Sequence, residues 1–153
     1  MNEQYYCGFE KLIETVKGLN FSENDIGKIT KAYKLADLAH EGQKRRSGEP
    51  YIIHPVAVAQ ILSDMGMDAD SVCAALLHDV VEDTEYTTAD IAREFGDGVA
   101  IIVDGVTKLT RLSYSMSISK EEIQAENYRK MFMAMAKDIR VILIKLADRL
   151  HNM

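Results

Sequence analysis

Two histidines and two aspartates in this 153-residue chain are of residue types that can bind a divalent metal. Each lies at the edge of an apolar run: His54 before Pro55, the adjacent pair His78 and Asp79 after AALL, and Asp148 within ILIKLADRL. Two imidazole nitrogens and two carboxylate oxygens form a mixed ligand set, suited to manganese, iron or zinc rather than calcium. A metal held by such ligands lowers the pKa of a bound water and polarises a phosphoryl oxygen.

The segment HDVVEDT, which begins at His78, adds two further carboxylates. On a single helix, His78 and Glu82 are four residues apart, as are Asp79 and Asp83, so all four share one face. Like charges at this spacing repel by roughly 0.2–0.5 kcal/mol per exposed pair, and a helix C-terminus disfavours anions. A bound divalent cation would reverse both effects. Glu82 and Asp83 would then be able to accept a proton from a water molecule.

The same residues also allow an interpretation without a metal. An acidic helix end on the surface needs only water around it, and a buried Asp148 can pair with Lys145 or Arg149. Spacing alone leaves both interpretations open. Of the other histidines, His40 is interpreted as a core or cap residue. His151, three residues after Asp148, is a candidate hydrogen-bond partner of that carboxylate.

Helix start and stop signals predict the elements that must position these side chains. Ser22 and Thr87 are each followed three residues later by Asp, a pattern typical of helix N-termini. The runs at 99–103 and 140–144 have strand propensity, but they continue into helix-favouring residues without a hairpin signal, so we expect an all-α fold. The expected helices cover residues 9–17, 22–41, 55–66, 70–83 (capped by Asp70 or Ser71), 87–96, 97–109, 119–137 and 138–153.

Two predicted loops are candidates for contact with a substrate. The loop KRRSG, residues 44–48, precedes His54 by a few residues. In an acidic protein such a basic patch suits the phosphates of an anionic ligand, although an exposed solubilising loop has the same composition. The polar segment 110–122, TRLSYSMSISKEE, is interpreted either as a mobile lid over the site or as an ordinary loop.

The composition fits one globular domain. Hydrophobic residues make up 47% of the chain and charged residues 27%, and the length suffices for one core. The formal net charge of −6 argues against a dedicated nucleic-acid binder. No apolar run approaches the roughly 20 residues that span a bilayer, the N-terminus has no signal-peptide pattern, and Cys7 and Cys73 form no disulfide motif. We therefore expect a cytoplasmic protein that binds neither nucleic acid nor membrane.

The sequence around the four candidate ligands resembles a known family. Their order, H…HD…D, resembles the signature of the HD-domain metal-dependent phosphohydrolases. The segments RRSGEPYIIHP, ALLHDVVEDT and IKLADRLHNM, in this order, resemble more narrowly the hydrolase domain of the RelA/SpoT homologue family, the long alarmone synthetase-hydrolases. The resemblance covers most of the chain, from about Ala32 to Met153.

This resemblance implies an HD-domain helical bundle with a mononuclear Mn²⁺ site. It implies hydrolysis of the 3′-pyrophosphate of guanosine tetra- or pentaphosphate, (p)ppGpp, to pyrophosphate and GDP or GTP. Glu82 and Asp83 match the acidic pair that positions or activates the attacking water. Arg46 stands where the family often has Lys, which keeps the charge but changes the geometry of phosphate binding. The matched metal ligands are His54, His78, Asp79 and Asp148, and the matched nucleotide contacts are Arg45, Arg46, Ser47 and Asn152.

By the same resemblance, residues 1–153 are one hydrolase domain, truncated at its C-terminal end, from a parent protein that continues into a synthetase domain. Two other functions are compatible with an HD-type sequence. Another HD-type nucleotide phosphohydrolase is disfavoured by the RRSGEPYIIHP loop. A non-catalytic regulatory module of a GTP pyrophosphokinase is disfavoured by Glu82 and Asp83, because a module that only binds nucleotide needs no water-activating pair.

Overall fold

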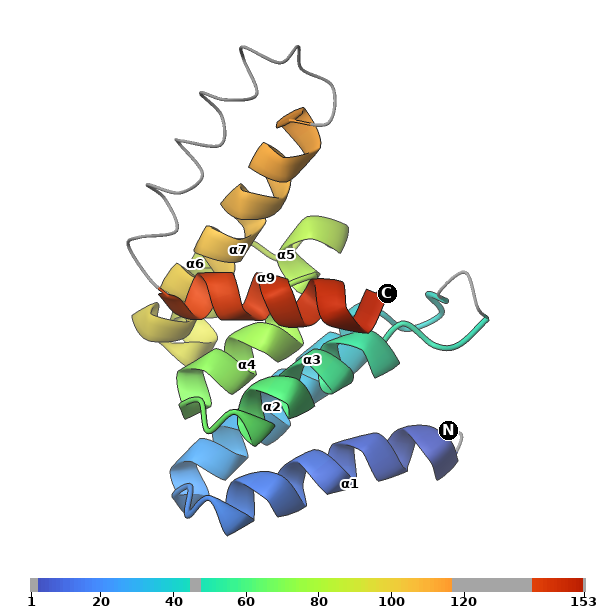
Figure 1. Ribbon diagram of the computed structural model, residues 1–153, viewed down its shortest axis with the longest axis vertical. Coiled ribbons are helices and arrows are strands. Elements are labelled where there is room, and N and C mark those ends of the chain that lie inside the picture. Colours follow the sequence, from blue (N-terminus) through green and yellow to red (C-terminus); the bar gives the residue numbers. More distant parts are fainter. Residues whose placement is uncertain (1–2, 45–47, 117–138, 153) are drawn as a thin grey trace.

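A computed structural model of the chain has the all-α fold that the sequence predicts (Figure 1). It describes the backbone of residues 3–44, 48–116 and 139–152. Within these ranges the extended structure is limited to one isolated β-bridge, between Lys44 and Pro50. The helices are α1 (Glu3–Gly18), α2 (Glu23–Ala39), α3 (Ile53–Asp64), α4 (Ala69–Leu77), α5 (Val80–Asp83), α6 (Thr88–Phe95), α7 (Asp97–Met116) and α9 (Ile139–Asn152).

Side-chain caps set the start of several helices. Ser22 caps α2 and Thr87 caps α6, each by accepting an N–H three residues further on, as the sequence predicts. At α4 the prediction of Asp70 or Ser71 as the cap is wrong. Asp68 is the cap, because its carboxylate accepts the N–H of Ser71, three residues further on, at 3.0 Å.

Two helices are longer than predicted. α1 begins at Glu3 rather than Phe9, and α7 runs to Met116, through most of the polar stretch that the sequence assigned to a loop or lid. The segment TRLSYSM contains neither Gly nor Pro, so nothing in it ends a helix that is already formed. The predicted helix at 119–137 lies outside the described residues. None of the described helices is long and apolar enough to cross a membrane.

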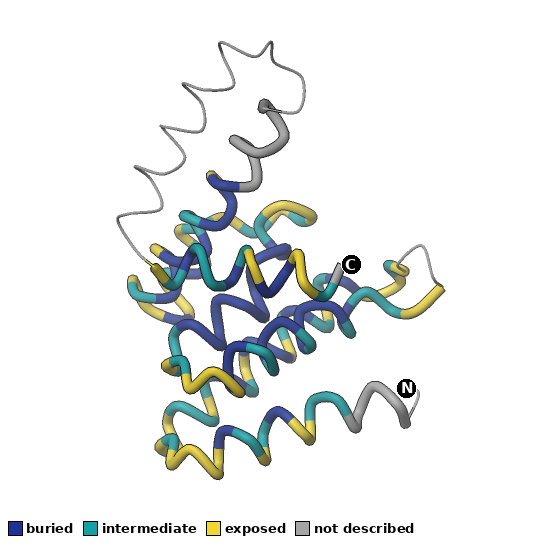
Figure 2. Tube along the Cα trace, viewed as in Figure 1, coloured by how far each residue is buried: buried dark blue, intermediate teal, exposed yellow. Residues whose placement is uncertain are grey.

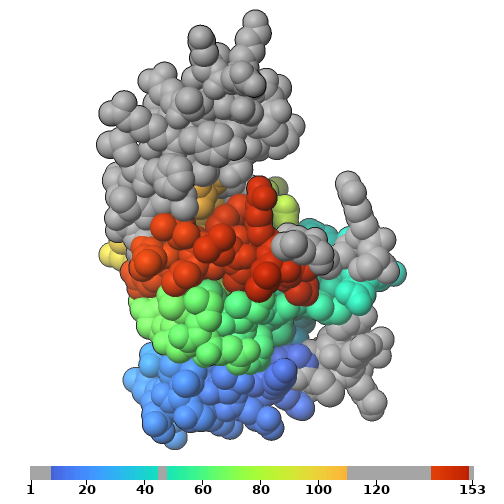
Figure 3. All heavy atoms as spheres, in the orientation of Figure 1, coloured from blue at the N-terminus to red at the C-terminus, as the bar shows by residue number. Residues whose placement is uncertain are grey.

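The centre of the bundle is α4. All seven residues from 71 to 77 are buried, as expected for a helix that is apolar on almost every side. α2, α3, α7 and α9 all contact it, and α1 packs on the outer side of α3. The buried part of the trace is concentrated in α3 and α4 (Figure 2). Figure 3 shows one face of the molecule as layers, with α9 over α3 and α4, and these over α1 and α2.

The helix predicted over 70–83 is interrupted at His78 and Asp79, which separate α4 from α5. Adjacent residues of a regular helix point about 100° apart, so one straight helix cannot aim both side chains at a single point. The Nδ1 atom of His78 lies 2.6 Å from the carbonyl oxygen of Ala75, which in an unbroken helix would accept the N–H of Asp79. The expectation of one continuous helix with four side chains on one face is therefore wrong.

The close approach of α7 and α9 depends on Gly105. A Cβ atom on Gly105 would lie 2.6 Å from Cγ2 of Val141, a buried residue of α9. We expect Gly105→Ala to lower the free energy of unfolding by roughly 1–3 kcal/mol, the usual effect of overpacking. Gly27→Ala in α2 is the control, because a Cβ there meets nothing within 4 Å; it should be neutral or stabilise by up to about 1 kcal/mol. Urea denaturation measures both, and equal stabilities would contradict the prediction.

Candidate metal centre

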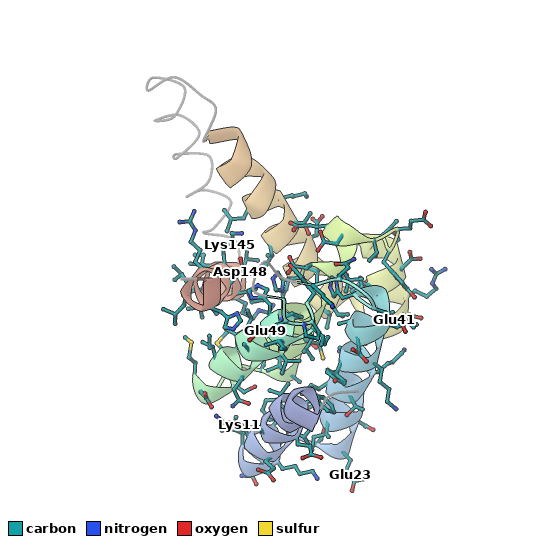
Figure 4. All side chains as sticks on the ribbon, turned by 90° about the vertical axis from the view of Figure 1, so that its right-hand side faces the viewer. Lys11, Glu23, Glu41, Glu49, Lys145 and Asp148 are labelled. Atoms are coloured by element: carbon teal, nitrogen blue, oxygen red, sulfur yellow. The ribbon has the colours of Figure 1, made fainter. Side chains whose placement is uncertain are left out.

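The four candidate ligands meet at one buried point of the bundle. Each offers one ligand atom, and these atoms all lie within 4.8 Å of one another. His54 comes from the first turn of α3, His78 and Asp79 from the junction between α4 and α5, and Asp148 from α9. In Figure 4, Asp148 lies beside Lys145 on α9. Three segments far apart in the sequence thus supply one cluster.

The distances within the cluster suit a single metal ion. Oδ1 of Asp148 lies 2.5 Å from Nε2 of His54 and 3.3 Å from Nε2 of His78. Oδ2 of Asp79 lies 3.2 Å from Nε2 of His78 and 4.0 Å from Nε2 of His54. Ligand atoms at about 2.1 Å from a metal are roughly 3–4 Å from one another. Three of the four distances lie in this range, whereas the one between Asp148 and His54 is that of a direct hydrogen bond. The donor set, two imidazoles and two carboxylates, therefore fits a divalent metal in its chemistry and, apart from this contact, in its spacing.

The outer nitrogens of both histidines contact other groups of the protein. Nδ1 of His78 faces the carbonyl oxygen of Ala75, so it carries a proton and donates, which leaves Nε2 to act as a ligand in the neutral ring. Nδ1 of His54 lies 2.8 Å from Nδ1 of His151 on α9, and the two rings are stacked with centroids 5.0 Å apart. Such contacts fix the orientation of a metal-binding imidazole. Spacing pointed His151 toward Asp148, whereas the structure places its ring against His54.

Each carboxylate of the cluster also has an outer partner. Nζ of Lys145 lies 3.4 Å from Oδ2 of Asp148, so one oxygen of this carboxylate faces the histidines while the other faces the lysine. The two sequence interpretations of Asp148 are therefore compatible. The hydroxyl of Tyr51 donates to Oδ2 of Asp79 at 2.6 Å. Helical spacing does not single out Tyr51; its position three residues before His54, in the motif that carries the family resemblance, is the signal that could have found it.

Charge pairing shifts the pKa values of the ligands. Burial would raise the pKa of Asp79, but the charge and hydrogen bond of His78, with the hydrogen bond from Tyr51, lower it to about 2. Burial likewise opposes ionisation of Asp148, but hydrogen bonds with His54 and His78 hold its pKa far below the usual range. Burial would lower the pKa of His78, yet Asp79 and Asp148 raise it well above the usual value. A proton on His78 therefore takes the place of a cation in the metal-free cluster.

The metal-free chain is expected to lose thermal stability as the pH rises above about 6.5. Because the pKa of His78 is raised in the folded chain, its contribution is fully present below the unfolded value of about 6.5 and is lost as the pH rises through the folded value. The pKa values of Asp79 and Asp148 are lowered, so their contributions are present above about 3.9 and stay constant in this range. Each kcal/mol moves Tm by roughly 2–4 °C in a domain of this size.

A bound divalent metal should reverse this slope, because binding requires the neutral imidazole and competes with protons. Thermal melts at several pH values, with a chelator and with Mn²⁺, measure the two curves. The stabilisation by Mn²⁺ is expected to grow as the pH rises. Two parallel curves would contradict the assignment of His78 as a ligand.

The predicted water-activating residues, Glu82 and Asp83, lie on α5 directly after the junction and are exposed. Neither residue is one of the four candidate metal ligands. Although both residues keep contact with solvent, the surrounding protein displaces part of the water around their carboxyl groups, and this loss of water, followed by the negative charge of Asp79, raises both pKa values. A raised pKa makes a carboxylate a better acceptor of a proton near neutral pH.

The loop predicted to contact a nucleotide is described only at its base. There the bridge between Lys44 and Pro50 closes the loop, and the N–H of Tyr51 donates to the carbonyl oxygen of Gln43 at 3.0 Å. This base is therefore connected, through Tyr51, to the cluster of ligands. The predicted nucleotide contacts fall outside the described part of the chain: Arg45, Arg46, Ser47 and the side chain of Asn152.

Comparison with known proteins finds a match to the HD domain over residues 32–153. The chain is 54% identical over 145 residues to guanosine-3′,5′-bis(diphosphate) 3′-pyrophosphohydrolase of Escherichia coli O157:H7, covering 95% of the chain and 20% of that protein. It is 51% identical over 146 residues to GTP pyrophosphokinase of Streptomyces coelicolor (strain ATCC BAA-471 / A3(2) / M145), covering 94% of the chain and 17% of that protein. The chain thus spans a fifth or less of the length of these relatives.

One solved structure is similar over most of the chain. It is described as "A metazoan ortholog of SpoT hydrolyzes ppGpp and plays a role in starvation responses". The match has a TM-score of 0.62 and 36% sequence identity, and it covers 82% of this chain and 67% of that one. At 36% identity the two chains are similar in sequence as well as in the arrangement of their helices.

Proposed function

Because the chain belongs to the HD domain family, we propose that it hydrolyses the 3′-pyrophosphate of (p)ppGpp to pyrophosphate and GDP or GTP. The observation that carries this proposal is the buried cluster of His54, His78, Asp79 and Asp148. Support for the substrate comes from the 54% identity to a protein named guanosine-3′,5′-bis(diphosphate) 3′-pyrophosphohydrolase.

We propose Mn²⁺ as the metal. Nε2 of His54 and of His78, with Oδ2 of Asp79 and Oδ1 of Asp148, would hold it, because these atoms face one another in the cluster. A mixed nitrogen and oxygen site favours a transition metal over calcium. When bound there, a divalent metal would polarise a phosphoryl oxygen and lower the pKa of a nearby water.

Glu82 and Asp83 are the proposed proton acceptors of the reaction. The water oxygen forms a bond to the phosphorus that carries O3′ of the ribose, and the bond between this phosphorus and O3′ breaks. One proton of the water passes to Glu82 or Asp83, which returns it to O3′, while the other stays with the pyrophosphate. The raised pKa values of both carboxyl groups suit this two-way transfer.

The basic loop is the proposed phosphate-binding element. Arg45 and Arg46 would pair with phosphate oxygens, which guanidinium groups can contact through two parallel hydrogen bonds. Ser47 and Asn152 would add neutral contacts to the nucleotide. The proposal is supported by the base of the loop, since Tyr51 joins it to Asp79 of the metal centre.

The function is tested by incubating the purified chain with ppGpp and Mn²⁺ and separating the products by ion-exchange chromatography. GDP and pyrophosphate are expected in equal amounts, and a chelator should prevent their formation. Release of orthophosphate, or turnover that is unaffected by the chelator, would contradict the proposal. A panel of nucleoside monophosphates and cyclic dinucleotides tests the alternative of another HD-type nucleotide phosphohydrolase.

A regulatory module is the second alternative. It would bind the guanosine nucleotide tightly without metal and without turnover, which calorimetry in the presence of a chelator detects. We assign no pyrophosphokinase activity to residues 1–153, because the relative with that name is matched over only 17% of its length. A longer parent protein with a synthetase domain, and a cytoplasmic location, stay predictions.

A further inference from the structure

The side chain of Tyr51 contacts the metal centre without contributing a ligand atom. Its hydroxyl donates to Oδ2 of Asp79 at 2.6 Å, the oxygen that also lies 3.2 Å from Nε2 of His78. A carboxylate oxygen has two lone pairs, so the hydroxyl can occupy one and leave the other for a metal. The hydroxyl is the donor in this contact, because an ionised carboxylate can only accept a hydrogen bond.

The ring of Tyr51 rests on His40, the residue that ends α2. Their ring centroids are 4.6 Å apart, and His40 is only 3% exposed. Nδ1 of His40 lies 3.2 Å from Oε1 of Gln43, whereas its Nε2 is buried and has no hydrogen-bond partner among the described residues. The imidazole is therefore held by Gln43 on one side and by the aromatic ring on the other.

Backbone hydrogen bonds close these residues into one unit. The N–H of Gln43 donates to the carbonyl oxygen of His40, and the N–H of Tyr51 donates to that of Gln43, each at 3.0 Å. His40, Gln43 and Tyr51 are thus joined through both main chain and side chains. A hydroxyl held by such a unit keeps a fixed position relative to α2 and α3.

We infer that Tyr51 is a positioning residue of the metal centre, which orients Asp79 for metal binding, and that His40 acts through Tyr51. Asp79 precedes the first residue of α5, and its side chain makes no capping hydrogen bond to that helix, so contacts from other residues must orient its carboxylate. Hydrogen bonds to a ligating carboxylate commonly determine metal affinity. This inference rests on the metal centre of the proposed function.

The test is Tyr51→Phe, which keeps the ring and removes only the hydroxyl. Calorimetric titration of the metal-free chain with Mn²⁺ should give an affinity roughly 10- to 100-fold lower than that of the unchanged chain. Far-ultraviolet circular dichroism should be unchanged. Tyr86→Phe, the same chemical change in the turn between α5 and α6, is the control and should bind Mn²⁺ as the unchanged chain does.

A double-mutant cycle tests the role of His40. His40→Asn can keep a donor near Gln43 but removes the ring surface under Tyr51. It should weaken Mn²⁺ binding in the unchanged background and have no further effect in the Tyr51→Phe background, since a residue that acts through the hydroxyl has nothing left to position. Equal effects in the two backgrounds would overturn this part of the inference.

The outcomes separate this inference from the proposed function. If the unchanged chain binds Mn²⁺ and Tyr51→Phe binds it equally well, the positioning role is refuted while the metal centre stands. If the unchanged chain binds no Mn²⁺, both fail. A fall in affinity that is equal for Tyr51→Phe and Tyr86→Phe would also overturn the inference, because it would show a general loss of packing.

Discussion

Asp148→Asn is expected to abolish Mn²⁺ binding and, with it, hydrolysis of ppGpp. One oxygen of this carboxylate contacts Nε2 of both histidines, at 2.5 and 3.3 Å. It is therefore the candidate ligand atom that lies next to both histidine nitrogens. An amide of the same size keeps the volume but removes the negative charge. The loss of affinity should exceed the roughly 100-fold limit typical of residues that only support a ligand.

Calorimetric titration with Mn²⁺ and a pyrophosphate-release assay measure the effect. Asp104→Asn is the matched control, because Asp104 makes its ion pair with Lys108 on the surface of α7, and such pairs contribute little. It should leave both measurements unchanged. Retention of metal binding by Asp148→Asn would remove this residue from the ligand set and contradict the proposed centre.

Glu82→Gln is expected to lower kcat by roughly 10²–10⁴-fold, the usual contribution of a general base, while Mn²⁺ binding stays unchanged. Metal binding should stay unchanged because Glu82 is not one of the four candidate ligands. Activity should fall because Glu82 lies within electrostatic reach of the centre: the charge of Asp79 is among the causes of its raised pKa. The amide keeps the shape of the side chain but cannot take up a proton.

Steady-state kinetics at saturating Mn²⁺, together with calorimetry, separate the two effects. Glu85→Gln, an exposed carboxylate three residues further on, is the control and should be fully active. Asp83→Asn, measured in parallel, shows which member of the acidic pair carries the proton. Full activity of both Glu82→Gln and Asp83→Asn would exclude a proton-accepting role for the pair.

The sequence predicts those parts of the structure that depend on local chemistry. The capping pattern at Thr87 is reproduced as a capping box, because the side-chain oxygen and the N–H that it accepts are only three residues apart. The runs at 99–103 and 140–144 are helical, as their helix-favouring continuations indicate. The four candidate ligands could be selected from the sequence because histidine and aspartate at the edges of apolar runs need a partner if they are buried, although spacing alone leaves a metal and an ion pair both open.

What the sequence does not predict depends on contacts between distant segments. The helix is interrupted at His78 and Asp79, where both side chains reach one point. Helix propensities describe single residues and carry no information on such a shared target. The stacking of His151 on His54 joins residues 97 positions apart. The hydroxyl of Tyr51 meets Asp79 across 28 positions. The contact of Tyr51 with Asp79 exists only once α3 and α4 have packed together, and that of His151 with His54 only once α9 has packed on α3.

The position of Asp148 on α9 has a consequence for the folding of the chain. The contact between His54 and Asp148 closes a loop of 94 residues, and closing so long a loop has an entropic cost that local helix formation does not repay. A metal bound at both ends of this loop would act as a reversible cross-link. Docking of the last described helix and uptake of the ion would then be a single linked equilibrium.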